Sequence, residues 1–222
     1  MKKIFIFAGL LALALPPPSA RAQTAASPVW EGSYEATRLP NEASEEGTRW
    51  QLLFKTPLAR AQLVDATLEL ETPSGTENIS YRIEGGPGKI WNPEPSAGTT
   101  LEFELQIIDQ FSGADAAQDI TARTPERTFH LFFTPTSVQC LGDGEKWSMD
   151  TTDRLHRYRL TIDPDGNGAL YVDDHPDPVL TTRGIANKRG LPFLDFGDAS
   201  NAYAGVARWK SLRWSHGGVF PP

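Results

Sequence analysis

Short segments that alternate apolar and polar residues follow one another along most of this chain, separated by turns rich in glycine and proline. Such alternation is typical of strands with one buried face. After residue 22 no segment keeps a helical period over three turns, and only Ala114–Ile120 fits a single turn. The pattern predicts an all-β chain whose two antiparallel sheets pack as a β-sandwich or jelly roll. Seven strands are expected, at Ala66–Glu71, Asn78–Glu84, Thr100–Ile108, Arg127–Thr134, His156–Ile162, Ala169–Asp173 and Val206–Trp214.

The N-terminal residues form a predicted export signal. Two lysines precede an apolar run over Ile4–Leu15, and Ala20 and Ala22 supply a small-x-small cleavage pattern. The run of about a dozen residues is too short to span a bilayer, which needs roughly 20. We therefore expect a periplasmic or extracellular protein without a membrane span. The expected division is a cleaved signal peptide over residues 1–22, a loose leader over 23–28 and one jelly-roll domain over 29–222.

Charge and cysteine content exclude several classes of function. The 222 residues carry a net charge of −7, and signal cleavage removes three basic residues and no acid, which lowers it to −10. Because an acidic surface repels phosphates, we expect no nucleic-acid partner. The one cysteine, Cys140, excludes a disulfide framework and an all-thiolate zinc site. A buried, inert thiol is the expected role of Cys140.

The C-terminal part of the chain carries a recognisable order of motifs. A His-x-Tyr strand within Leu155–Ile162 leads through a hairpin to a Tyr-Val-Asp strand in Ala169–Asp174, followed by Phe-Gly-Asp in Leu194–Asp198 and a Trp-containing strand over Ala204–Trp214. These motifs resemble the concanavalin A-like lectin/glucanase superfamily, especially the laminin-G-like jelly rolls of exported bacterial proteins. The resemblance implies two packed antiparallel sheets, one of them concave. It leaves the function open, because that fold carries lectins, hydrolases, lyases and interaction modules.

The polar positions of three predicted strands give the first candidate site. Apolar residues alternate with polar ones, and we expect the polar side chains to line one exposed sheet face. Carboxylates two residues apart on a strand approach the separation of about 5–5.5 Å that retaining glycosidases use. The plain alternative is a solvated face of an antiparallel sheet. The residues of this predicted face are Arg82, Glu102, Glu104, Gln106 and His130.

The resemblance also suggests two catalytic hypotheses for this face. Glucanases of the superfamily carry Glu-x-Asp-x-x-Glu on one strand, and here Ile107 stands where the third carboxylate belongs, so the acid role is unfilled. A lyase would use Arg82 to neutralise a uronic carboxylate and His130 as the base. The alginate-lyase motifs of the fold are not visible around either residue.

Two acidic loops are weak candidates for calcium. Asp163, Asp165, Asn167 and Asp174 fit the 12-residue calcium-loop template on paper. Their flanks read as strands, so a metal-free hairpin turn is the preferred interpretation. Asp195 and its neighbours Asp198, Ser200 and Asn201 form an oxygen-rich segment that we interpret as an Asx-type turn.

Two tryptophans in loop-like contexts give a binding signal. Trp91 and Trp147 lie beside turn residues, and a sugar's apolar face stacks well on such rings. Burial under a loop is the alternative for both.

The sequence as a whole predicts a lectin-like jelly roll that binds a poly- or oligosaccharide without catalysis. No cofactor is required, although calcium is possible. One alternative is a glycoside hydrolase or polysaccharide lyase on the concave face, with Glu102, Glu104 and His130 as catalytic residues. Another is a cell-envelope module that binds protein and no sugar. Arg82, Gln106, Trp91 and Trp147 are the predicted ligand-binding residues.

Overall fold

The structure is a computed structural model that describes residues 27–42, 50–188 and 190–222. The predicted signal peptide and residues 23–26 of the predicted leader lie outside these described residues. The described part of the chain consists of strands, loops and one 3-10 turn, η1 (Pro40–Glu42). No helix in it is long and apolar enough to cross a membrane. The predicted all-β class is confirmed.

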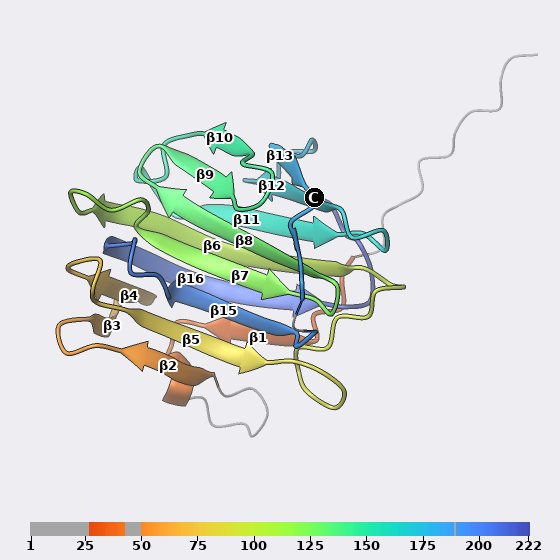
Figure 1. Ribbon diagram of the computed structural model, residues 1–222, viewed down its shortest axis with the longest axis horizontal. Coiled ribbons are helices and arrows are strands. Elements are labelled where there is room, and N and C mark those ends of the chain that lie inside the picture. The colour runs from red at the N-terminus through yellow and green to blue at the C-terminus, as the bar shows by residue number, and fades with distance from the viewer. Residues whose placement is uncertain (1–26, 43–49, 189) are drawn as a thin grey trace, which may run out of the picture.

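Two antiparallel sheets of eight strands each form a sandwich (Figure 1). In the first, which we call sheet A, the strand order is β13-β12-β11-β6-β16-β4-β3, and β1 also pairs with β16. The long strands β6 and β16 pair at its centre. Its strands are β1 (Gly32–Glu35), β3 (Arg60–Val64), β4 (Thr67–Thr72), β6 (Thr99–Gln110), β11 (His156–Ile162), β12 (Gly168–Val172), β13 (Leu180–Thr182) and β16 (Gly205–Ser215).

The second sheet, sheet B, has the order β10-β9-β8-β7-β15-β5-β2, and β14 also pairs with β8. Here β7, β8 and β15 lie side by side at the centre (Figure 1). Its strands are β2 (Gln51–Lys55), β5 (Ile79–Glu84), β7 (Gln118–Arg123), β8 (Arg127–Thr134), β9 (Ser137–Cys140), β10 (Lys146–Ser148), β14 (Ile185–Ala186) and β15 (Phe193–Asp198).

Alternate side chains of each sheet point toward the other sheet and form the core. From β6, Leu101, Phe103, Leu105 and Ile107 are fully buried. The ring of Phe103 packs edge-to-face on Phe133 of β8, with centroids 5.9 Å apart, and so joins the two sheets. Each such side chain contributes roughly 1.5–3 kcal/mol by leaving water. The side chains that point away from the core take no part in this packing, so these positions can hold functional groups.

The seven predicted strands all form, with ends within two residues of the prediction. The predicted helical turn at Ala114–Ile120 is wrong, because the chain enters strand β7 at Gln118. Within β7, Ile120 and Ala122 face the core while Asp119 and Thr121 face outward, which is a strand's period.

Candidate functional site

The predicted single polar face is divided between the two sheets. Glu102, Glu104 and Gln106 lie on β6 of sheet A, whereas Arg82 lies on β5 and His130 on β8 of sheet B. Each points away from the core of its own sheet, so the two groups occupy opposite outer faces of the sandwich. The prediction that they line one face is wrong. Alternation shows which positions of a strand face outward, but it does not show to which sheet the strand belongs.

On sheet A, Glu102 is held by two arginines. Its Oε2 accepts hydrogen bonds from Arg159 Nη2 at 2.5 Å and Nε at 2.8 Å, and its Oε1 accepts from Arg213 Nη2 at 2.5 Å and Nε at 2.9 Å. The side chain of Glu102 is only 5% exposed. Both oxygens are therefore occupied by guanidinium groups, and the carboxylate is closed to a substrate.

The neighbouring Glu104 is also paired. Its carboxylate lies 3.0 Å from Lys210 Nζ and 3.3 Å from Arg157 Nη2. Burial alone would raise the pKa of Glu104, but the hydrogen bonds and charges of Lys210 and Arg157 outweigh it and hold the pKa below its ordinary value. A glycosidase acid needs a raised pKa, so Glu104 does not fit that role. Gln106 is likewise engaged, donating through Nε2 to Thr152 O at 2.7 Å.

Sheet B brings four ionisable side chains together on its outer face. The register places Arg82 opposite Asp195, Asp195 opposite Thr121, and Thr121 opposite His130. Arg82 donates to Asp195 Oδ2 from Nη2 at 2.5 Å and from Nε at 3.1 Å. His130 Nε2 lies 3.0 Å from Asp119 Oδ2. We call Arg82, Asp119, Thr121, His130 and Asp195 the sheet B cluster.

Burial dominates the electrostatics of the sheet B cluster. Asp195 is 3% exposed and Asp119 2%. Burial, followed by the negative charge of Asp119, raises the pKa of Asp195 to about 6, although Arg82 opposes the shift. Burial would lower the pKa of His130, but its hydrogen bond to Asp119 and the charges of Asp119 and Asp195 raise it above its ordinary value. The pKa values of both Asp195 and His130 are thus raised, that of Asp195 chiefly by burial and that of His130 by the neighbouring carboxylates in spite of its burial.

Aromatic rings lie on both sides of the sheet B cluster. Phe132 of β8 stacks on Tyr203, with centroids 6.1 Å apart and planes 23° apart, and Tyr203 also meets the ring of His130 at 6.2 Å. At the other end, the guanidinium groups of Arg82 and Arg123 lie 3.8 Å and 4.1 Å from the centroid of the Phe193 ring. The sheet B cluster thus lies between partly exposed aromatic rings, Phe132 on one side and Phe193 on the other, while Tyr203 is buried.

Of the side chains on this surface, the alternation in the sequence predicts only Arg82 and His130. The oxygen-rich pattern around Asp195 indicates a turn, and no pattern singles out Asp119, Thr121, Phe132 or Phe193. The available signal was the alternation in Leu194–Phe196, which places an aspartate between two core residues. Such an aspartate points outward at the centre of the sheet, where a lone carboxylate needs a partner.

The two tryptophans behave differently from each other. Trp91 is fully buried, donates from Nε1 to Arg123 O at 2.8 Å and packs edge-to-face on Trp214. The prediction of a ligand contact for Trp91 is therefore wrong, because its ring belongs to the core. Trp147 is 42% exposed on the edge strand β10. Two strands, β9 and β8, separate it from β7, so it does not border the cluster's centre.

The predicted calcium ligands are not brought together. Both oxygens of Asp163 accept hydrogen bonds from Asn167, and this turn closes one end of the β11–β12 hairpin. Asp174 lies beyond the other end, where it accepts from Arg157 Nη1 at 2.8 Å. Asp165 is exposed in the turn. In the described ranges no group of three or more His, Cys, Asp or Glu side chains is placed to hold a metal ion.

The sequence matches no protein-family model and no curated protein. Solved structures do match. A carbohydrate esterase of the Shiga toxin-encoding bacteriophage phi24B aligns over 85% of this chain and 98% of its own, with 10% identity and a TM-score of 0.57. The potassium-bound Emp46p carbohydrate recognition domain aligns over 86% of this chain and 100% of its own, with 14% identity and a TM-score of 0.51.

The chain has the concanavalin A-like jelly-roll fold. A sialidase aligns over 84% of this jelly roll with a TM-score of 0.54 and 12% identity, but the match spans only 18% of the sialidase. At such identities the likeness concerns the fold alone. The jelly roll is thus one whose solved relatives in shape include carbohydrate-recognising and carbohydrate-modifying proteins.

Proposed function

We propose that this jelly roll is an exported, non-catalytic glycan-binding domain, and that a poly- or oligosaccharide binds on the outer face of sheet B. One observation carries the proposal: the fixed polar groups of the sheet B cluster lie directly between the aromatic pair Phe132–Tyr203 and the ring of Phe193. Export and a periplasmic or extracellular location rest on the N-terminal pattern of lysines, apolar run and small residues.

This combination suits a sugar for physical reasons. The C–H face of a pyranose is apolar and packs on a ring, while its hydroxyls need both donors and acceptors nearby. Arg82 is 28% exposed at its side chain and His130 20%, so both can donate to a ligand while their buried partners hold them in place. Side chains already ordered lose little entropy when a ligand binds.

A lyase or hydrolase on the same face is the second candidate. It is supported by the pKa of about 6 for Asp195 beside a second carboxylate, Asp119, and by the presence of Arg82 and His130 on one surface. Binding without catalysis is favoured because Asp195 is bound by Arg82 and His130 by Asp119. A general acid or base must reach the proton that it transfers.

A glycan array followed by product assays separates these functions. We expect the chain purified without residues 1–22 to bind at least one poly- or oligosaccharide and to release neither new reducing ends nor unsaturated products from it. New reducing ends would indicate a hydrolase, and unsaturated products a lyase. Binding to no glycan would contradict both the glycan-binding and the enzymatic function, and would favour a cell-envelope module that binds protein.

A further inference from the structure

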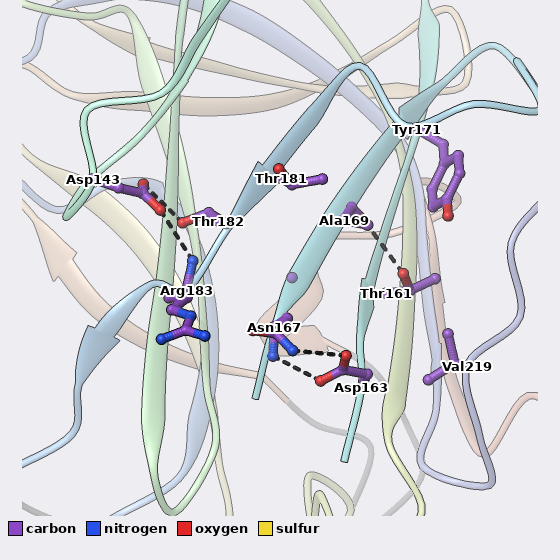
Figure 2. Close-up of a pocket in the computed structure, with 11 residues that line it drawn as sticks. Asp143, Thr161, Asp163, Asn167, Ala169, Tyr171, Thr181, Thr182, Arg183 and Val219 are labelled. Carbon is purple, nitrogen blue, oxygen red and sulfur yellow. Dashed lines mark hydrogen bonds between the residues drawn. The ribbon is translucent and has the colours of Figure 1, made fainter. Parts of the chain in front are cut away.

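A cavity of about 570 Å³ lies at the β13 edge of sheet A. It is bordered by the β11–β12 hairpin, the end of β13, the loop at Asp143 and the C-terminal segment at Val219 (Figure 2). Its volume falls within the roughly 300–1,000 Å³ usual for ligand pockets. None of its lining residues belongs to the sheet B cluster. It is therefore a separate place on the molecule.

Two carboxylates in this cavity are fixed in position. Asp143 accepts from the Thr182 hydroxyl at 2.9 Å and from the Arg183 backbone N at 3.0 Å, and Asp163 accepts twice from Asn167 (Figure 2). In both, burial raises the pKa, but the hydrogen bonds to the carboxylate together outweigh it and hold the pKa below its ordinary value. Backbone N–H groups of neighbouring residues, that of Glu145 for Asp143 and those of Asp165 and Gly166 for Asp163, also stabilise the ionised forms. Both carboxylates are therefore ordered anions that line the cavity.

The cavity also offers a donor and a ring. The Arg183 guanidinium is exposed and has no hydrogen bond or ion pair within the described part of the chain. Tyr171 is partly exposed on β12. Ala169, two residues before it on the same face of the strand, has a small side chain and leaves space beside the ring. Acceptors, a free donor and an aromatic wall thus surround one space.

The local charge selects among polar ligands. Two carboxylates and one guanidinium line the cavity, so its net charge is negative and it would repel a phosphate or a uronate. A hydroxyl, by contrast, donates to a carboxylate and accepts from a guanidinium. We propose that this cavity is a second binding site, which takes a neutral saccharide, with Tyr171 under its apolar face and Asp143, Asp163 and Arg183 on its hydroxyls. This inference does not depend on glycan binding at sheet B.

Amide chemical-shift mapping tests the inference directly. The probes are neutral tetrasaccharides of glucose, mannose, galactose and xylose, and the comparison is a tetragalacturonate. We expect at least one neutral probe to shift amides within residues 163–171 and 181–183, with the tetragalacturonate giving no shift there. Arg183→Ala and Tyr171→Ala should each weaken that binding about tenfold, equivalent to about 1.4 kcal/mol.

Arg60→Ala is the matched control, because Arg60 is an exposed arginine on the edge strand β3 of sheet A, far from the cavity in strand order. It should leave the affinity unchanged. The inference is overturned if no neutral probe shifts these amides, or if the shifts survive both cavity variants. Shifts confined to residues 119–132 and 193–203 would overturn it while supporting the glycan site on sheet B.

Discussion

At the scale of single residues, Glu102 shows how an exposed-looking position becomes part of the scaffold. It lies on the outer row of β6, yet Arg159 and Arg213 from the two neighbouring strands close over it, leaving it 4% exposed. A buried carboxylate between two guanidiniums holds three strands of sheet A in register. Glu102 therefore stabilises sheet A, and its carboxylate is not free to contact a ligand.

Glu102→Gln should lower the free energy of unfolding by about 2 kcal/mol. Breaking a fully buried ion pair costs about 3–5 kcal/mol, and the value is smaller here because the Arg213 side chain is 39% exposed. Urea unfolding measures it. Glu71→Gln is the control, since its partner Arg60 is 74% exposed and the expected change is below about 1 kcal/mol. Equal losses for the two variants would contradict this account of Glu102.

The sequence alone predicts the direction in which single side chains point, but it does not predict the residues with which they pair. Alternation correctly turned Glu102, Arg82 and His130 outward. Arg159 and Asp195, the partners of Glu102 and Arg82, come from strands distant in sequence, whereas Asp119, the partner of His130, lies on the preceding strand β7. No local pattern shows which strands become neighbours. The ion pairs of Glu102 and those of the sheet B cluster therefore follow only from the order of the strands in each sheet.

At the scale of the elements, β15 fixes the centre of sheet B. It pairs with β5 and β7 and carries Asp195. Two residues later, Gly197 adopts φ +125°, and a Cβ there would lie 2.4 Å from Ile79 O. Only glycine suits both the backbone angle and the close approach of β5.

Gly197→Ala should therefore destabilise the fold by roughly 1–3 kcal/mol for the backbone angle alone, and by more once the contact with Ile79 O is added. Gly86→Ala is a matched control, because Gly86 has a similar φ of +123° with nothing within 4 Å of its Cβ position. Thermal unfolding compares the two. The steric account fails if Gly86→Ala costs as much as Gly197→Ala.

Prediction of elements worked where strands were long and apolar. The core rows of β6, β8 and β11 were read correctly, because their alternation runs over seven residues or more. The edge elements β10, β13 and β14 span only two or three residues, which is too few to show a period. Strand β7 was missed because polar side chains such as Gln118 and Asp119 are buried in it.

At the scale of the whole molecule, buried acids with raised pKa values link stability to pH. The pKa is about 6 for Asp195 and about 7 for Asp198, in both cases chiefly through burial. In the unfolded chain an aspartate ionises near about 3.9. Between about pH 4 and 7 the folded protein therefore holds protons that the unfolded chain has released, so its stability falls as pH rises. The pKa of His130 is raised above its ordinary value of 6.5, so His130 also makes the protein less stable as the pH rises beyond that value.

We accordingly expect the melting temperature to be highest in mildly acidic solution, near about pH 5, and to decline toward pH 8. Below about pH 4 it should fall again, because Asp143, Asp163 and Glu104 have lowered pKa values and lose their hydrogen bonds or ion pairs when protonated. Asp198→Asn should flatten the decline between pH 4 and 7 in scanning calorimetry. A melting temperature that rises steadily from pH 5 to pH 8 would contradict the assignment.

The central claim is that glycan binds at the sheet B cluster on the outer face of sheet B, and not at Glu102 and Glu104 on sheet A. Isothermal titration of the best array glycan into the wild type, Phe132→Ala and Glu104→Gln tests it most directly. Phe132 is partly exposed over the sheet B cluster, and Glu104 lies on the opposite face. Loss of one aromatic contact predicts about tenfold weaker binding for Phe132→Ala, roughly 1.4 kcal/mol, and an unchanged constant for Glu104→Gln. Weaker binding by Glu104→Gln with unchanged binding by Phe132→Ala would contradict the claim.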